Sequence, residues 1–114
     1  MNPWNLIDTS EIPNNGGELR LYQRGKEHTI AIAGEGELMS SRVFASEQAL
    51  AELGCASIAQ REKARVVVGG LGMGYTLASA LQQVPENAEV VVAELVPAVV
   101  RWNREYLGDY AGHP

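Results

Sequence analysis

Apolar and polar positions alternate in the first third of the chain. Leucines and then isoleucines occupy every second position of two short runs, the period of a strand with one buried face. These residues are Leu19, Leu21, Ile30 and Ile32. Residues 24–27, Arg-Gly-Lys-Glu, separate the runs and have the composition of a turn. We therefore predict a β-hairpin, preceded over residues 1–17 by an irregular lead-in rich in proline, asparagine and glycine that ends in a turn.

The period then changes to that of a helix. Residues 46–60 carry apolar side chains near helical spacing and begin with Ser46, a residue type that is typical of N-caps. The apolar positions are Leu50, Leu53 and Ile58. The segment is predicted to form an amphipathic helix that links the hairpin to the rest of the chain.

Two runs of three valines, in residues 65–69 and 89–94, have the pattern of buried parallel strands. A helical segment over residues 73–84 follows the first run and ends before Pro85, and a second helix is expected to begin near Pro97. Consecutive parallel strands require a crossover of this kind. The expected fold class is α/β, with a small N-terminal β-hairpin region and then the first strand-helix-strand-helix unit of a Rossmann-like doubly wound parallel sheet.

Composition narrows the classes of function. The 114 residues allow one domain at most, and we divide the chain into a lead-in (1–17), a hairpin with its linking helix (18–60) and a Rossmann-like half-domain (61–114). A net charge of −5 without a basic cluster argues against a nucleic-acid partner. No apolar run reaches the ~20 residues of a membrane helix. The absence of a secretory signal and the single cysteine, Cys55, lead us to expect a cytoplasmic location.

The most informative motif is the glycine turn, which we define as residues 70–74, Gly-Leu-Gly-Met-Gly. Glycines allow a tight turn and the close approach of a ligand, and the following helix offers free backbone amides. The dinucleotide fingerprint places its third glycine three positions after the second, where this chain has Tyr75. The spacing disfavours NAD and favours an adenosyl-thioether. The alternative is that the glycines serve only the turn and close helix packing.

An acidic residue completes this pattern. Glu94 ends the second valine strand, about where a carboxylate in such folds accepts hydrogen bonds from both ribose hydroxyls. The alternative is an exposed charge at the strand end, or an ion-pair partner for Arg101 or Arg104.

Residues 70–77, GLGMGYTL, and 94–97, ELVP, resemble the G-G-G-D-G-G-T-L turn and the E-x-x-P element of spermidine synthases. Three further segments resemble the spermidine synthase-like branch: Leu38-Met39-Ser40-Ser41-Arg42, Ser46-Glu47 and Trp102-Asn103-Arg104. With these segments the resemblance covers residues 18–114. It implies a small β-domain before a doubly wound sheet. It also implies a transferase that moves an aminopropyl group, or in a divergent member a methyl group, from decarboxylated S-adenosylmethionine or S-adenosylmethionine to an amine acceptor.

The resemblance also implies roles for particular residues. The three glycines would line the amino-acid or aminopropyl moiety of the donor, Glu94 would hold its ribose and Leu95 would lie against its adenine. The glycines are Gly70, Gly72 and Gly74. Met73 stands where spermidine synthases carry an aspartate that helps to bind the donor's amine, a departure that bears on specificity for the decarboxylated donor.

No catalytic residue is assigned, because the catalytic aspartate of the family follows a later strand than those found here. We therefore expect a fragment that is inactive alone and that associates with a second copy, since its strands would otherwise have open edges and uncovered faces. The alternatives are a non-catalytic nucleotide-binding remnant, an oligomerisation module or a divergent methyltransferase fragment.

The remaining chemically active side chains are expected to have structural roles. His28 and His113 lack nearby acidic or cysteine ligands at metal-site spacing, so surface positions and no metal are expected. Cys55 is expected to be a buried, inert thiol. The aromatic residues are expected mainly in the core: Tyr22, Tyr75, Trp102 and Tyr106.

Overall fold

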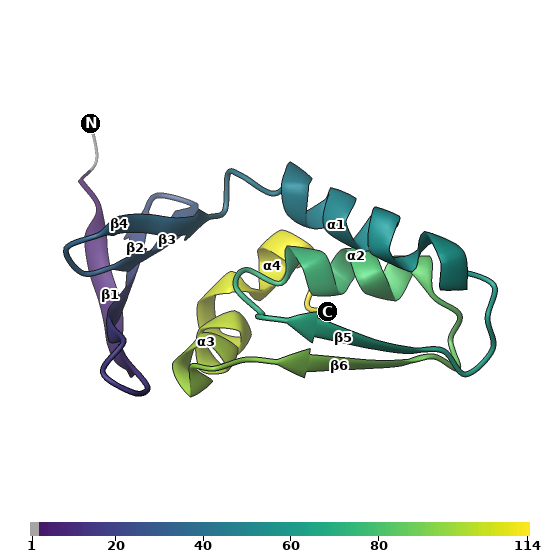
Figure 1. Ribbon diagram of the computed structural model, residues 1–114. Coiled ribbons are helices and arrows are strands. Elements are labelled where there is room, and N and C mark those ends of the chain that lie inside the picture. Colours follow the sequence, from purple (N-terminus) through teal and green to yellow (C-terminus); the bar gives the residue numbers. More distant parts are fainter. Residues whose placement is uncertain (1–2) are drawn as a thin grey trace.

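The computed structural model describes residues 3–114, which form a mixed α/β fold with two sheets. Figure 1 shows the larger sheet at one end of the molecule, the smaller sheet with its covering helices at the other, and helix α3 between them. The larger sheet is antiparallel, in the order β1-β2-β3-β4, and the smaller is a parallel pair, β5-β6. The strands are β1 (Asn5–Ile12), β2 (Gly17–Arg24), β3 (Glu27–Ile32), β4 (Gly36–Ser40), β5 (Arg65–Gly69) and β6 (Glu89–Ala93).

Strands β2 and β3 form the centre of the larger sheet. Leu19 lies opposite Ile32 and Leu21 lies opposite Ile30, so the alternating apolar residues share one face. Leu19, Leu21 and Ile30 are buried on that face. The sheet is larger than the two-stranded hairpin expected from the sequence, because β1 and β4 extend it on either side.

The prediction of an irregular lead-in over residues 1–17 is wrong for most of its length. Residues 5–12 form β1, which pairs with β2, and residues 1–2 lie outside the described residues. The sequence does not indicate this strand, because β1 lies at the edge of the sheet and exposes polar residues such as Thr9 and Glu11 to solvent. Its sequence therefore has no clear alternation of apolar and polar residues. The predicted turn is present at residues 13–16, where Asn14 and Asn15 adopt left-handed conformations, with φ of 61° and 59°.

Helices cover one face of the smaller sheet (Figure 1). Strands β5 and β6 pair in parallel from Arg65 opposite Glu89 to Gly69 opposite Ala93, and α2 connects them. A core of small and β-branched side chains joins α1, α2 and β5: Ala51, Cys55, Val68 and Ala80. The helices are α1 (Ala45–Cys55), η1 (Ala56–Ile58), α2 (Tyr75–Gln83), α3 (Pro97–Trp102), η2 (Asn103–Leu107, a π-helix) and α4 (Gly108–Ala111).

Helix α1 differs from its prediction at its start and on its buried face. The N-cap position is Phe44, and the Ser46 hydroxyl bonds to the Glu47 carboxylate instead of capping the helix. Leu50 and Leu53 are exposed, while the small residues Ala51 and Cys55 pack inward. Small side chains let α1 approach α2 closely. The burial of Cys55 agrees with its prediction.

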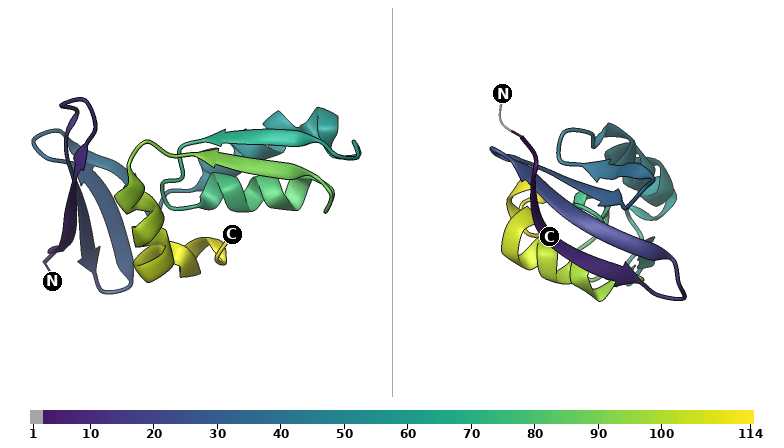
Figure 2. Two further views of the ribbon diagram at one scale, coloured as in Figure 1. Left: turned by 90° about the horizontal axis from the view of Figure 1, so that it is seen from below. Right: turned by 90° about the vertical axis from the view of Figure 1, so that its left-hand side faces the viewer.

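The second core lies between the larger sheet, α3 and the glycine turn. Its fully buried members include Leu21, Ile30, Trp102 and Leu107, and Met73 brings the glycine turn into the same cluster. The two views of Figure 2 show α3 against the larger sheet. Trp102 also donates a 2.8 Å hydrogen bond from its indole nitrogen to Asp8. The turn is therefore held at the junction of both halves of the molecule.

The valine runs predicted parallel strands that are buried on both faces, and this prediction is wrong for one face. Val66, Val68, Val90 and Val92 face the helices, but Val67 points the other way and is 70% exposed. Val91 lies on the same open face in β6 and is 43% exposed.

Candidate functional site

The glycine turn connects the end of β5 to the start of α2. Gly70, Gly72 and Gly74 all have left-handed backbones, with φ of 88°, 54° and 86°. Residues with a Cβ rarely adopt these conformations, which explains the glycine at each position. The Gly70 amide donates to the Ala93 carbonyl over 2.8 Å, so the turn is tied to the end of β6.

Glu94 comes directly after β6 and contacts the glycine turn. The Leu71 amide donates to Glu94 Oε1 over 2.7 Å, and the Val96 amide donates to Glu94 Oε2 over 3.0 Å. The two features paired by sequence reasoning are thus in direct contact. Each carboxylate oxygen keeps further lone pairs that could accept a ligand hydroxyl.

The alternative ion-pair roles of Glu94 are wrong. The Arg101 guanidinium lies 3.0 Å from Asp8, a residue of β1. Within residues 3–114, Arg104 forms no ion pair at all. The structural bonds of Glu94 are to backbone amides instead.

Asn103 is a second residue that holds the turn. Its side-chain amide donates to the Gly72 carbonyl over 2.7 Å and to the Val99 carbonyl over 2.9 Å. Sequence reasoning included Asn103 only in the family resemblance and assigned it no contact. No local signal could reveal the bond, because its partners are 31 positions apart.

A cavity of about 400 Å³ opens beside Glu94, within the range of small-molecule sites. Its walls include Leu71 of the glycine turn, Leu77 of α2, Val92 of β6, and the polar residues Asn103 and Arg104. Among the side chains of the described residues that line it, Glu94 has the one carboxylate and Arg104 the one guanidinium. The cavity thus combines an apolar wall with the Glu94 carboxylate, the Arg104 guanidinium and the His113 imidazole.

The other residues of the turn region divide between core and surface. Met73 is 4% exposed and packs in the core, and the buried Tyr75 donates a 2.8 Å hydrogen bond to the Ser41 carbonyl. Leu95, expected against an adenine, is 62% exposed and does not line the cavity. Of the aromatic residues expected in the core, Trp102 and Tyr75 are buried, while Tyr106 is exposed.

His28 is buried, so its expected surface position is wrong. Its Nδ1 lies 2.6 Å from the Tyr110 hydroxyl, which itself donates to the Lys26 carbonyl. Burial lowers the pKa of His28. Sequence reasoning missed this contact because Tyr110 is 82 positions away.

The rest of the described chain adds no metal centre. His113 is exposed and pairs with Asp109 over 2.7 Å. Residues 3–114 contain no cluster of three or more metal-ligating side chains. No helix in that part of the chain is both long enough and apolar enough to cross a membrane.

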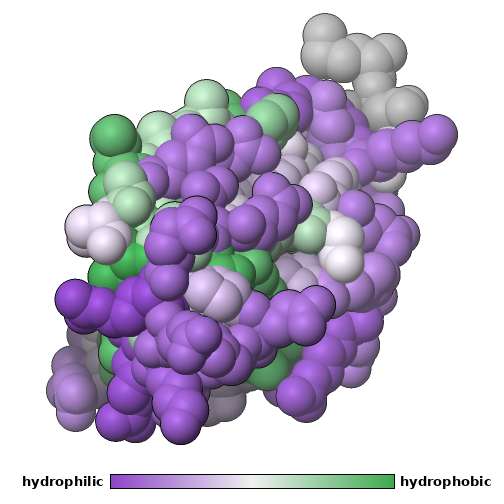
Figure 3. Space-filling view, turned by 90° about the vertical axis from the view of Figure 1, so that its right-hand side faces the viewer, coloured by the Kyte–Doolittle hydropathy of each residue, from purple (hydrophilic) through white to green (hydrophobic). Residues whose placement is uncertain are grey.

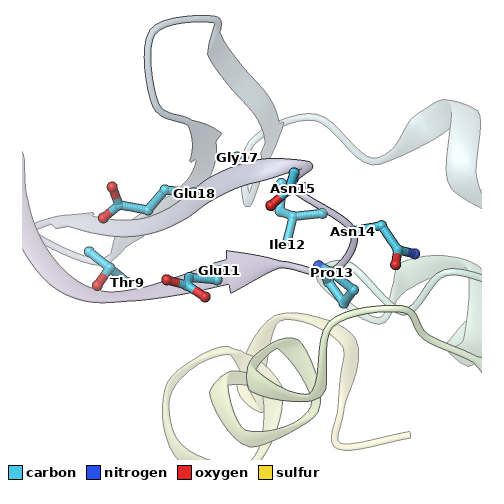
Figure 4. Close-up of a pocket in the computed structure, with 8 residues that line it drawn as sticks. All are labelled: Thr9, Glu11, Ile12, Pro13, Asn14, Asn15, Gly17 and Glu18. Carbon is cyan, nitrogen blue, oxygen red and sulfur yellow. The ribbon is translucent and has the colours of Figure 1, made fainter.

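A larger hollow, of about 850 Å³, lies elsewhere, at the β1–β2 hairpin. Figure 4 shows its lining of hairpin side chains, with the Glu11 and Glu18 carboxylates on the two strands. These residues pair directly across the ladder, and Glu18 also lies 3.5 Å from Arg20. None of the residues singled out for ligand binding lies in this hollow.

No protein-family model matches the chain, and no curated protein matches it. The function is therefore argued from the glycine turn, Glu94 and the cavity beside them.

Proposed function

We propose that this chain binds an adenosyl-thioether at the cavity beside Glu94 and Leu71, the one residue of the glycine turn that lines it, as a spermidine synthase-like member of the adenosylmethionine-dependent transferases. The ligand is S-adenosylmethionine, its decarboxylated form or the thioether product of either. The ribose hydroxyls donate to Glu94, and the donor's side chain lies along the glycine turn. The acceptor is a small amine.

One observation carries this proposal, namely the contact between Glu94 and the glycine turn. The carboxylate lies 2.7 Å from the Leu71 amide and lines the cavity with Leu71. A ribose-binding acid and a turn that admits a ligand to the backbone are both needed for an adenosyl site. Their proximity, with apolar walls around them, supports a nucleoside ligand.

The fold supports the same class of ligand. The unit β5-α2-β6-α3 corresponds, in our proposal, to the first half of a Rossmann-like doubly wound sheet. Nucleotide ligands of such sheets bind beyond the carboxyl ends of the parallel strands. The glycine turn follows β5 and Glu94 follows β6, so both occupy these ends.

Transfer of an alkyl group from a sulfonium to an amine depends largely on positioning. The amine must also lose a proton. Glu94 has the one carboxylate side chain among the described residues that line the cavity, and its oxygens accept two backbone amides and, in the proposed complex, the ribose hydroxyls. We therefore assign binding, and no proton transfer, to these residues.

A second candidate function is purely structural. Both Glu94 oxygens accept backbone amides, so the carboxylate could act only as a staple that fixes the turn to the end of β6. This is the non-catalytic alternative, and it predicts that loss of the carboxylate lowers stability while no adenosyl ligand binds.

Calorimetric titration with methylthioadenosine and with adenosylhomocysteine tests the proposal. We expect the wild-type chain to bind at least one of them, and Glu94→Gln to weaken binding by about tenfold or more, because it removes a charged acceptor of two hydroxyls. Circular dichroism of the variant reports whether it remains folded.

The matched control is Glu89→Gln, which removes a carboxylate from the opposite end of β6. The Glu89 side chain is exposed and, within residues 3–114, forms an ion pair only with Arg65, over 3.2 Å, so its loss should change neither binding nor stability appreciably. Absence of binding by both ligands, together with a lower melting temperature for Glu94→Gln, would favour the structural staple.

A further inference from the structure

We infer that the donor taken by this cavity carries a carboxylate, as S-adenosylmethionine does, and is not the decarboxylated donor. This inference rests on the proposed function and concerns the substrate class of the same site. The two donors differ only in the carboxylate next to their amino group. The charges around the glycine turn therefore decide between them.

The turn offers no anion to a cationic aminopropyl chain. Its two side chains, Leu71 and Met73, are apolar, and Met73 is 4% exposed within the core that includes Trp102. Met73 cannot turn outward without leaving a space in that core. The Glu94 oxygens are engaged by the Leu71 and Val96 amides and, in the proposed complex, by the ribose.

A cation is available instead. Arg104 lines the cavity together with Glu94 and Leu71, and within residues 3–114 it forms no ion pair. The preceding residue, Asn103, bonds to the Gly72 carbonyl, so the start of η2 is fixed against the turn. A guanidinium at this place can bind a carboxylate with two parallel hydrogen bonds.

The other charges near this cavity do not change the assignment. His113 also lines it, but its imidazole pairs with Asp109. Arg101, on the preceding helix α3, is paired with Asp8. Arg104 is therefore the group that would discriminate between the two donors.

Titration with adenosylhomocysteine and with its decarboxylated analogue, which lacks only the carboxylate, tests the inference. We expect the wild-type chain to bind adenosylhomocysteine about tenfold more tightly, the usual effect of one charge-assisted hydrogen-bonded pair. Arg104→Gln should abolish this preference by weakening adenosylhomocysteine alone. The preference should also decrease with added salt, because Arg104 is exposed.

Arg61→Gln is the matched control, because Arg61 is an exposed arginine that lies outside the cavity lining. It should retain the preference of the wild-type chain. Equal binding of both ligands by the wild type, or a preference that survives Arg104→Gln, would overturn the inference and leave the adenosyl site intact. Failure of both ligands and of methylthioadenosine to bind would refute the proposed function, and this inference with it.

Discussion

At the scale of single residues, His28 is an unusual buried base. It is 6% exposed, and its Nδ1 must donate to Tyr110, because the Tyr110 hydroxyl already donates to the Lys26 carbonyl. Nε2 is then a buried acceptor without a partner in the described part of the chain. A proton added there would have no acceptor, which agrees with the lowered pKa of His28.

This geometry predicts that stability falls between about pH 7.5 and about pH 5.5. With the pKa lowered in the folded chain, the unfolded chain takes up the proton first, at its ordinary pKa of about 6.5. The free energy of unfolding is therefore highest above that pH and decreases as the pH falls toward the folded-state pKa. Urea unfolding at the two pH values measures the difference, and His28→Gln should reduce it.

His113→Gln is the control for the histidine prediction. His113 lies on the surface, so His113→Gln removes no buried imidazole and should not abolish the fall in stability that we assign to His28. An equal slope in wild type and His28→Gln would show that other groups cause any acid sensitivity.

The positions of candidate site residues were predictable where they depend on local sequence pattern. The glycines of the turn and Glu94 stand at the ends of two recognisable strands, and their spacing was enough to pair them. His28 and Asn103 depend on partners 82 and 31 positions away, and no pattern in one sequence encodes such contacts. Met73 was recognised as a departure from the spermidine synthase turn, but its burial follows from the packing of α3.

At the scale of elements, the glycine turn is conformationally demanding. Gly72 has a φ of 54°, and a Cβ at this position would lie 2.8 Å from the Met39 sulfur. An alanine would thus meet a disfavoured backbone region as well as a contact that Met39 must move to relieve. Gly72→Ala should lower the free energy of unfolding by about 1–2 kcal/mol, measured by urea unfolding.

The same substitution in a helix should have the opposite effect. Gly54 lies in α1, and a Cβ added there would have no atom within 4 Å outside its own helix. Gly54→Ala should therefore raise stability by about 0.5–1 kcal/mol. If Gly72→Ala were as well tolerated as Gly54→Ala, the claim that the turn requires a left-handed backbone at Gly72 would be contradicted.

Strands with a continuous β-branched run were predicted closely, and a strand with a mixed polar pattern was not. β5 was predicted at its observed bounds and β6 within one residue, because a short β-branched run bounded by charged residues or glycine is typical of a strand. β1 was missed, because Thr9 and Glu11 belong to a strand with one solvated edge. In α1 the leucines suggested the wrong buried face, since close packing on α2 selects the smaller Ala51 and Cys55.

At the scale of the whole molecule, apolar surface gathers around the parallel sheet. Val67 and Val91 lie on its open face, and Leu50 and Leu53 are exposed on the neighbouring α1. Within residues 3–114, β5 pairs with a strand on one side only. Figure 3 views this end of the molecule and shows hydrophobic surface, in green, between polar side chains. An unpaired β-branched edge with apolar flanks is a template for pairing with another chain.

We therefore predict that the chain by itself associates through β5. Sedimentation should show species larger than one chain at micromolar concentration, and Val67→Lys should shift the distribution to the monomer, because a charge on the edge strand opposes pairing. Leu81→Lys is the matched control, since Leu81 is an exposed apolar residue of α2 (45%) and should leave association unchanged. A stable wild-type monomer would contradict the prediction. Equal disruption by both substitutions would instead assign the association to general surface hydrophobicity, because association through the parallel sheet makes Val67 more sensitive than Leu81.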